Sequence, residues 1–183
     1  MGRAYFQTET LEFIPDLLAL HSLFPRRYPH LLASAARGND DARYDILFAC
    51  PQETVSGDNF LDALDKEYKQ HKVSNSNTSL PFYGGWFLYL GYELAQEIEP
   101  SLNLVRASDD IPVAFATRFP AAVIIDHLTQ SALVVCENQQ HECLTQILND
   151  ITHTRNLEKK YRQGFQATSL QEDDSSTYLV QVE

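Results

Sequence analysis

The sequence of 183 residues holds few side chains whose types and spacing could do chemistry. Asp126 and His127 are adjacent, as a general acid/base pair could be, but they are expected at the rim of a hairpin, where polar residues are needed for solubility alone. The run His141, Glu142 and Cys143 contains three metal-ligand types, but consecutive helical residues point in different directions and no second ligand set follows at metal spacing. We therefore predict no catalytic residue and no metal site in this sequence.

Acidic residues dominate the charge of the chain. They cluster at 40–41, 109–110 and 172–174, where solvated loops are the simplest interpretation and binding of a cation by one cluster is the alternative. The sequence has 25 acidic and 14 basic residues, which gives a formal net charge of -11. Nucleic acids and anionic membranes both require clustered Lys and Arg, so this charge argues against them as partners. A small molecule or another protein is the expected partner.

The three cysteines, Cys50, Cys136 and Cys143, have no spacing that indicates a disulfide framework or a zinc motif. We therefore predict three free thiols, which fits a reducing cytoplasm. No signal peptide is recognisable, because acidic residues interrupt the apolar run near the start of the chain. No stretch approaches the roughly 20 apolar residues that a membrane-spanning helix requires.

Three glycines stand in an aromatic segment, LPFYGGWFLYLGYELAQEIEP, at residues 80–100. Gly84 and Gly85 do not belong to a phosphate-binding loop, because neither the Gly-Lys-Ser/Thr ending nor a GxGxxG pattern is present. The pattern predicts a bent or bulged strand whose glycines allow another backbone or a bulky side chain to approach. Gly91 is expected to form a tight junction between this strand and a short helix.

The remaining pattern is that of an α+β protein with an antiparallel β-sheet core and flanking helices. A strand opens the chain and a helix follows Pro15. Two strands joined by residues 36–42 are predicted to pair as an antiparallel hairpin. Further elements are predicted, in chain order: a helix at 59–71, the glycine-aromatic strand, a short helix at 92–99, strands at 113–119, 121–127 and 131–137, and an amphipathic helix from 144 onwards.

Two segments together resemble a family. Residues 80–99 are similar to the PF-x-GG…GY-[DE]-L segment of component I of the chorismate-utilising synthases, which make 4-amino-4-deoxychorismate or anthranilate. Residues 29–51 are similar to the earlier LL-x-S…R-[YF]-[DS]-I segment, with Ser34 and Arg43 nine residues apart. Both occur in the family's order and spacing, and with the hairpin at 123–135 the resemblance covers nearly the whole chain.

Two positions bear on the branch of the family. Anthranilate synthases typically carry Leu-Leu-Glu-Ser and Arg-Tyr-Ser, whereas Ala33 and Asp45 stand here, as in the aminodeoxychorismate enzymes. The resemblance therefore favours aminodeoxychorismate synthase component I, on the route to 4-aminobenzoate and folate. Anthranilate synthase component I, on the route to tryptophan, is the alternative.

The resemblance also implies a domain division. Residues 1–174 would form the amino-terminal domain, and 175–183 the start of a larger chorismate-binding domain. That second domain would handle chorismate, Mg²⁺ and the acid/base chemistry, and a glutamine amidotransferase subunit would supply ammonia. The chain alone is therefore expected to be inactive and to hold no cofactor. A stand-alone amino-acid sensor or interaction module is the alternative, and the reading frame after Glu183 would distinguish the two.

The resemblance implies a tryptophan pocket lined by the first hairpin. The Ser34 hydroxyl and nearby backbone would bind the charged groups of the amino acid, and Arg43 would fix the loop or the ligand carboxylate. Leu32 and Tyr44 would offer apolar surface to the indole. The alternative is that Ser34 only satisfies a strand edge and Arg43 only makes a surface salt bridge.

Overall fold

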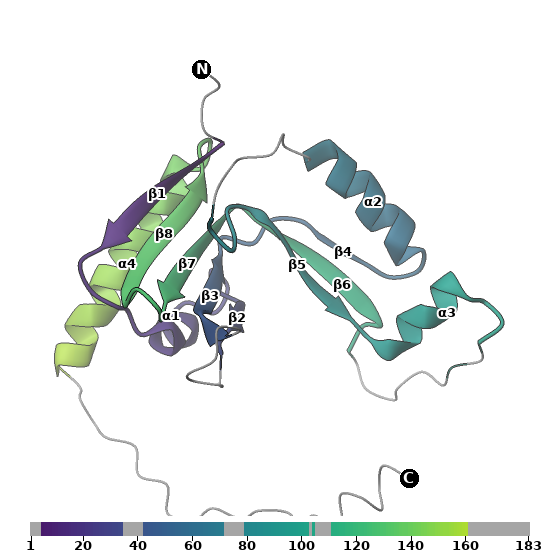
Figure 1. Cartoon of the computed structure of the whole chain (residues 1–183), viewed down its shortest axis with the longest axis horizontal. Helices are drawn as coiled ribbons and strands as arrows, with labels where there is room; N and C mark the ends of the chain where they lie inside the picture. Colours follow the sequence, from purple (N-terminus) through teal and green to yellow (C-terminus); the bar gives the residue numbers. More distant parts are fainter. Residues whose placement is uncertain (1–4, 35–41, 72–78, 103, 105–110, 161–183) are drawn as a thin grey trace, which may run out of the picture.

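A computed structural model of the chain describes residues 5–34, 42–71, 79–102, 104 and 111–160 (Figure 1). The predicted domain division at 174/175 and the three acidic clusters lie outside these residues. In the described part, no helix is long and apolar enough to cross a membrane.

The first of two antiparallel sheets has five strands in the order β1-β8-β7-β3-β2. Their bounds are Phe6–Leu11 (β1), Ser131–Glu137 (β8), Ala121–Asp126 (β7), Tyr44–Ala49 (β3) and His30–Leu32 (β2). Helices α1 (Leu17–Leu23) and α4 (His141–Lys160) lie on one face of this sheet (Figure 1). Their apolar residues, which include Leu20, Ile147 and Ile151, are buried against alternate strand residues such as Leu47 and Val123. This burial is the main stabilising contribution to that layer.

The second sheet has three strands in the order β4-β6-β5. Their bounds are Thr54–Ser56 (β4), Ala114–Phe119 (β6) and Gly85–Leu90 (β5). Helix α2 (Phe60–His71) packs Phe60 against Ala114 and Ala116 of β6, whose small side chains allow the helix to approach. A 3-10 turn, η2 (Tyr92–Leu94), and a short helix, α3 (Ala95–Ile98), follow β5.

An aromatic cluster joins the two sheets. Pro120 separates β6 from β7, so one continuous stretch of chain passes from the second sheet into the first. His30 of β2 stacks on Phe87 of β5, with ring centroids 4.1 Å apart. Phe48 of β3 contacts Phe87 and Phe119, at 5.3 and 5.4 Å between centroids. Such offset and edge contacts add to the burial of the rings.

The predicted fold class is confirmed, and the structure adds two features. The hairpin of β2 and β3 and that of β7 and β8 are antiparallel, as expected. The antiparallel core consists of two sheets, and the chain passes from one to the other at Pro120, which has no backbone N–H for strand pairing. Strand β4 was not predicted, because three residues are too few for an alternation to be recognised.

The glycine-aromatic segment has the close approach that its sequence predicts. Gly84 has φ +114°, and a Cβ added there would meet the carboxylate of Glu137. Glu137 forms a buried ion pair with Arg118, whose Nη1 also donates to the carbonyls of Gly85 (3.1 Å) and Phe119 (2.6 Å). At Gly91 a Cβ would lie 2.7 Å from the Val113 carbonyl, so this junction also requires glycine.

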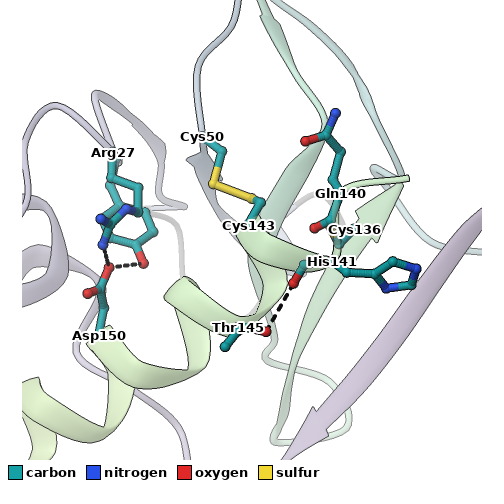
Figure 2. The surroundings of a disulfide bond; sticks show 9 residues. Arg27, Cys50, Cys136, Gln140, His141, Cys143, Thr145 and Asp150 are labelled. Atoms are coloured by element: carbon teal, nitrogen blue, oxygen red, sulfur yellow. Dashed lines mark hydrogen bonds and ion pairs between the residues drawn. A yellow bond between two sulfur atoms is a disulfide. The ribbon is translucent and has the colours of Figure 1, made fainter. Parts of the chain in front are cut away.

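The prediction of three free thiols is wrong. Cys50, just after β3, forms a disulfide with Cys143 in the first turn of α4, as Figure 2 shows. A separation of 93 residues in sequence conceals the proximity, which arises only because α4 packs across the sheet that contains β3. Cys136 is free and buried, and burial raises the pKa of its thiol to about 11. Because two of the three cysteines are joined in a disulfide, the cysteines no longer support the prediction of a reducing compartment.

Candidate functional site

The four residues predicted to line an amino-acid pocket lie at the end of the β2–β3 hairpin where the two strands are connected. Leu32 is the last residue of β2, Ser34 follows it, and Arg43 and Tyr44 lie at the start of β3. Leu32 pairs with Ile46, two residues from Tyr44, so Leu32 and Tyr44 belong to the same face of the sheet. The hairpin therefore brings the four predicted residues together, and residues 35–41 between them lie outside the described part.

The two apolar members differ in exposure. The Leu32 side chain is exposed, with 51% of the residue accessible. Tyr44 is half-buried against the cluster of Ala122, Ile124 and Val135. Leu32 therefore offers an exposed apolar surface and Tyr44 a packed one, on the sheet face that also carries Ile46.

Arg43 is held by Asp126 from the end of β7. Its Nε donates to Oδ1 (3.1 Å) and its Nη2 donates to Oδ2 (2.7 Å). Hydrogen bonding to the guanidinium holds the pKa of the Asp126 carboxyl far below its usual value of 3.8. The guanidinium carbon also lies 4.7 Å from the centroid of the Tyr44 ring, in a cation–π contact. The surface salt bridge considered as the alternative is thus present, with the Arg43 side chain 40% exposed.

Ser34 is held through its backbone. Its amide donates to Asp45 Oδ1 at 2.8 Å. The other oxygen of Asp45, Oδ2, lies 2.9 Å from His127 Nε2. Asp45 therefore links the end of β2 to the turn after β7.

Three residues of this charged group were not predicted as site residues: Asp45, Asp126 and His127. The adjacent Asp126 and His127 do not act as a pair, because Asp126 binds Arg43 while His127 binds Asp45. These three residues could be found only from the register of β3 with β7, in which Tyr44 lies opposite Asp126. That register is not readable from either strand alone.

The arrangement has two carboxylates, one guanidinium and two apolar side chains around the hairpin end. Carboxylates can accept from an ammonium group, and a guanidinium can donate to a carboxylate. A guanidinium has five N–H donors, so Arg43 can bind a second carboxylate while it keeps Asp126. These are the groups that recognition of an amino acid requires.

No protein-family model matches the sequence, and no curated protein is similar to it. Solved structures that resemble the fold include anthranilate synthase component I from Streptococcus pneumoniae TIGR4. The two align with a TM-score of 0.48 and 19% sequence identity, over 86% of this chain and 38% of that chain. This chain thus spans well under half the length of that protein, and so distant a likeness carries no argument about function.

Proposed function

We propose that this chain is the amino-terminal domain of component I of a chorismate-utilising synthase, of the aminodeoxychorismate branch. In this proposal it supports a separate chorismate-binding domain, which contains the Mg²⁺ site and the catalytic residues. The complete component would accept ammonia from a glutamine amidotransferase subunit and make 4-amino-4-deoxychorismate for 4-aminobenzoate and folate synthesis. The hairpin end with Leu32, Ser34, Arg43 and Tyr44 would bind tryptophan.

The observation that carries the proposal is that the two family-like segments form one structural unit. The first provides β2 and β3, and the second provides β5. They meet at the stacked pair His30 and Phe87 and at the edge contact of Phe48 with Phe82, 5.0 Å between centroids. Two segments separated by 28 residues resemble one family in order and spacing and also pack together, which supports a common origin rather than two chance matches.

The chemistry of the hairpin end supports an amino acid as the ligand. The indole of tryptophan would contact Leu32 and Tyr44, its carboxylate would meet Arg43, and its ammonium group would lie near Asp45. Half of Leu32 is open to solvent, so much of the indole would stay hydrated. We expect a dissociation constant of about 1 mM, near -4 kcal/mol.

Amide-shift mapping by NMR tests the pocket. Addition of L-tryptophan should shift the amides of residues 31–34 and 43–46 in a saturable manner, and L-alanine, which lacks the indole, should not. R43Q should weaken binding at least about tenfold, because it removes the charged partner of the ligand carboxylate. T145A, on the exposed surface of α4, is the matched control and should bind as the wild type does. Saturating tryptophan without shifts in the hairpin would remove ligand binding from the proposal.

Genetic complementation tests the branch. The reading frame that contains this sequence should restore growth of a bacterium that requires 4-aminobenzoate because it lacks component I. It should not restore one that requires tryptophan for the corresponding reason. The 183-residue chain alone should restore neither and should not convert chorismate in the presence of ammonia and Mg²⁺. Rescue of the tryptophan requirement alone would assign the other branch, and conversion by the chain alone would overturn the domain assignment.

A further inference from the structure

A cluster of three metal-ligand side chains lies on the second sheet and its helix, away from the β2–β3 hairpin end. Glu53 precedes β4, and Glu67 and His71 lie one turn apart near the end of α2. One ligand atom from each of the three lies within 4.8 Å of the other two. In the described part of the chain, no other group of three such side chains comes as close.

The orientation of His71 leaves one ring nitrogen for a cation. Nδ1 lies 3.0 Å from the backbone carbonyl of Glu67. A carbonyl only accepts, so Nδ1 must carry the proton and donate. In the neutral imidazole the lone pair is then on Nε2, which faces Glu53 Oε1 at 3.3 Å. Two acceptors that face each other at this distance leave room for a positive ion between them, and a metal ion bound there would have a ligand atom on each side.

The surroundings favour a positive charge. His71 is in the last turn of α2, where the helix macrodipole is negative. Two carboxylates are present, and the side chains of His71 and Glu53 are 35% and 43% exposed, so an ion can enter from solvent. The ring of Trp86 in β5 makes a T-shaped contact with the His71 ring, with centroids 5.9 Å apart.

The donor set indicates which ion. One imidazole nitrogen with two carboxylates is a set that Zn²⁺ and similar transition metals bind, whereas Ca²⁺ and Mg²⁺ prefer oxygen alone. Ligands about 2.1 Å from a tetrahedral zinc lie about 3.4 Å apart, close to the observed distance from His71 to Glu53. The ligand atom of Glu67 lies within 4.8 Å of those of the other two residues, so Glu67 would be the third ligand and water would take the fourth position. The hydrogen bond from His71 Nδ1 to a carbonyl is the supporting contact that metal-bound histidines usually make.

We propose that Glu53, Glu67 and His71 form a binding site for a divalent transition metal of the Zn²⁺ class. The ion would tie the end of α2 to the segment that leads into β4, at the edge of the second sheet. This site is independent of the proposed amino-acid pocket and of the synthase function.

The single tryptophan of the sequence, Trp86, reports on this site. Co²⁺ bound at His71 should quench its fluorescence in a saturable titration of one ion per chain, and Zn²⁺ should compete and restore the signal. H71Q and E53Q should each weaken Co²⁺ binding at least about tenfold. H127Q removes another histidine that faces a carboxylate and is the matched control, which should bind Co²⁺ as the wild type does.

Circular dichroism and thermal melting establish that each variant is folded. In the same melts, Zn²⁺ should raise the melting temperature of the wild type and of H127Q but not that of H71Q. The proposal is overturned if quenching does not saturate, or if H127Q loses as much affinity as H71Q. It is also overturned if ¹⁵N NMR shows His71 doubly protonated at neutral pH and unchanged by Zn²⁺, because a proton alone then fills the position.

Discussion

Unfolded under non-reducing conditions, the protein will react with one equivalent of a thiol reagent, and after reduction it will react with three. The single thiol is Cys136, which is buried in the native state and should react only on unfolding, because burial raises the pKa of its thiol to about 11. The two others are Cys50 and Cys143, which the disulfide joins.

Loss of that bond should lower the free energy of unfolding by about 4 kcal/mol, since a cross-link between residues 93 apart removes much of the entropy of the unfolded chain. The C50S/C143S variant and the reduced wild type should show this loss equally in urea unfolding. C136S is the matched control and should keep the disulfide. Three reactive thiols in the unreduced, unfolded protein, or equal stability of C50S/C143S and oxidised wild type, would contradict the bond.

Patterns with a local cause were readable from the sequence. The hairpin of β7 and β8 consists of two apolar runs on either side of a short polar turn, and α4 repeats Leu144, Ile147, Leu148 and Ile151 at helical spacing. In both cases neighbours in sequence are neighbours in space, so the pattern and the structure carry the same information.

What the sequence did not reveal depends on contacts between distant segments. The disulfide requires α4 to lie across β3, and the Glu53 and His71 contact requires α2 to pack on the second sheet. The division into two sheets falls at Pro120, between β6, which pairs in the second sheet, and β7, which pairs in the first. None of these follows from the periodicity of one segment, because each is decided by how the layers assemble.

The candidate site shows the same limit. Leu32, Ser34, Arg43 and Tyr44 were expected together because a hairpin joins them, and the hairpin does place them at one end. Asp126, the partner of Arg43, ends a strand some 80 residues later, and His127, the partner of Asp45, follows it. Only the register of β3 with β7 brings them there. Asp126 and His127 therefore add charged partners to the hairpin end and restrict the side chains of Arg43 and Asp45.

Substitution of Gly84 by alanine should lower the free energy of unfolding by about 4 kcal/mol. Part of the loss, about 1–2 kcal/mol, is backbone strain, because the residue has φ +114°. The larger part arises at Glu137, whose carboxylate occupies the place of the new Cβ. Glu137 cannot move freely, because it neutralises Arg118, which is only 3% exposed. Displacement of the carboxylate would leave a buried guanidinium without its counter-ion, a change that costs about 3 kcal/mol or more.

Gly57→Ala separates the two contributions. Gly57 also has a positive φ, +97°, but a Cβ there would meet nothing within 4 Å, so this variant should lose only the strain. In the background R118M/E137A, which removes the ion pair, the additional cost of Gly84→Ala should fall to that of Gly57→Ala. Urea unfolding of the four variants gives both differences, and the change between backgrounds is the coupling energy of Gly84 with the pair. If Gly84→Ala and Gly57→Ala lower the free energy of unfolding equally in the wild-type background, Glu137 moves aside without destabilising the protein. Glycine is then needed at position 84 for the backbone conformation alone.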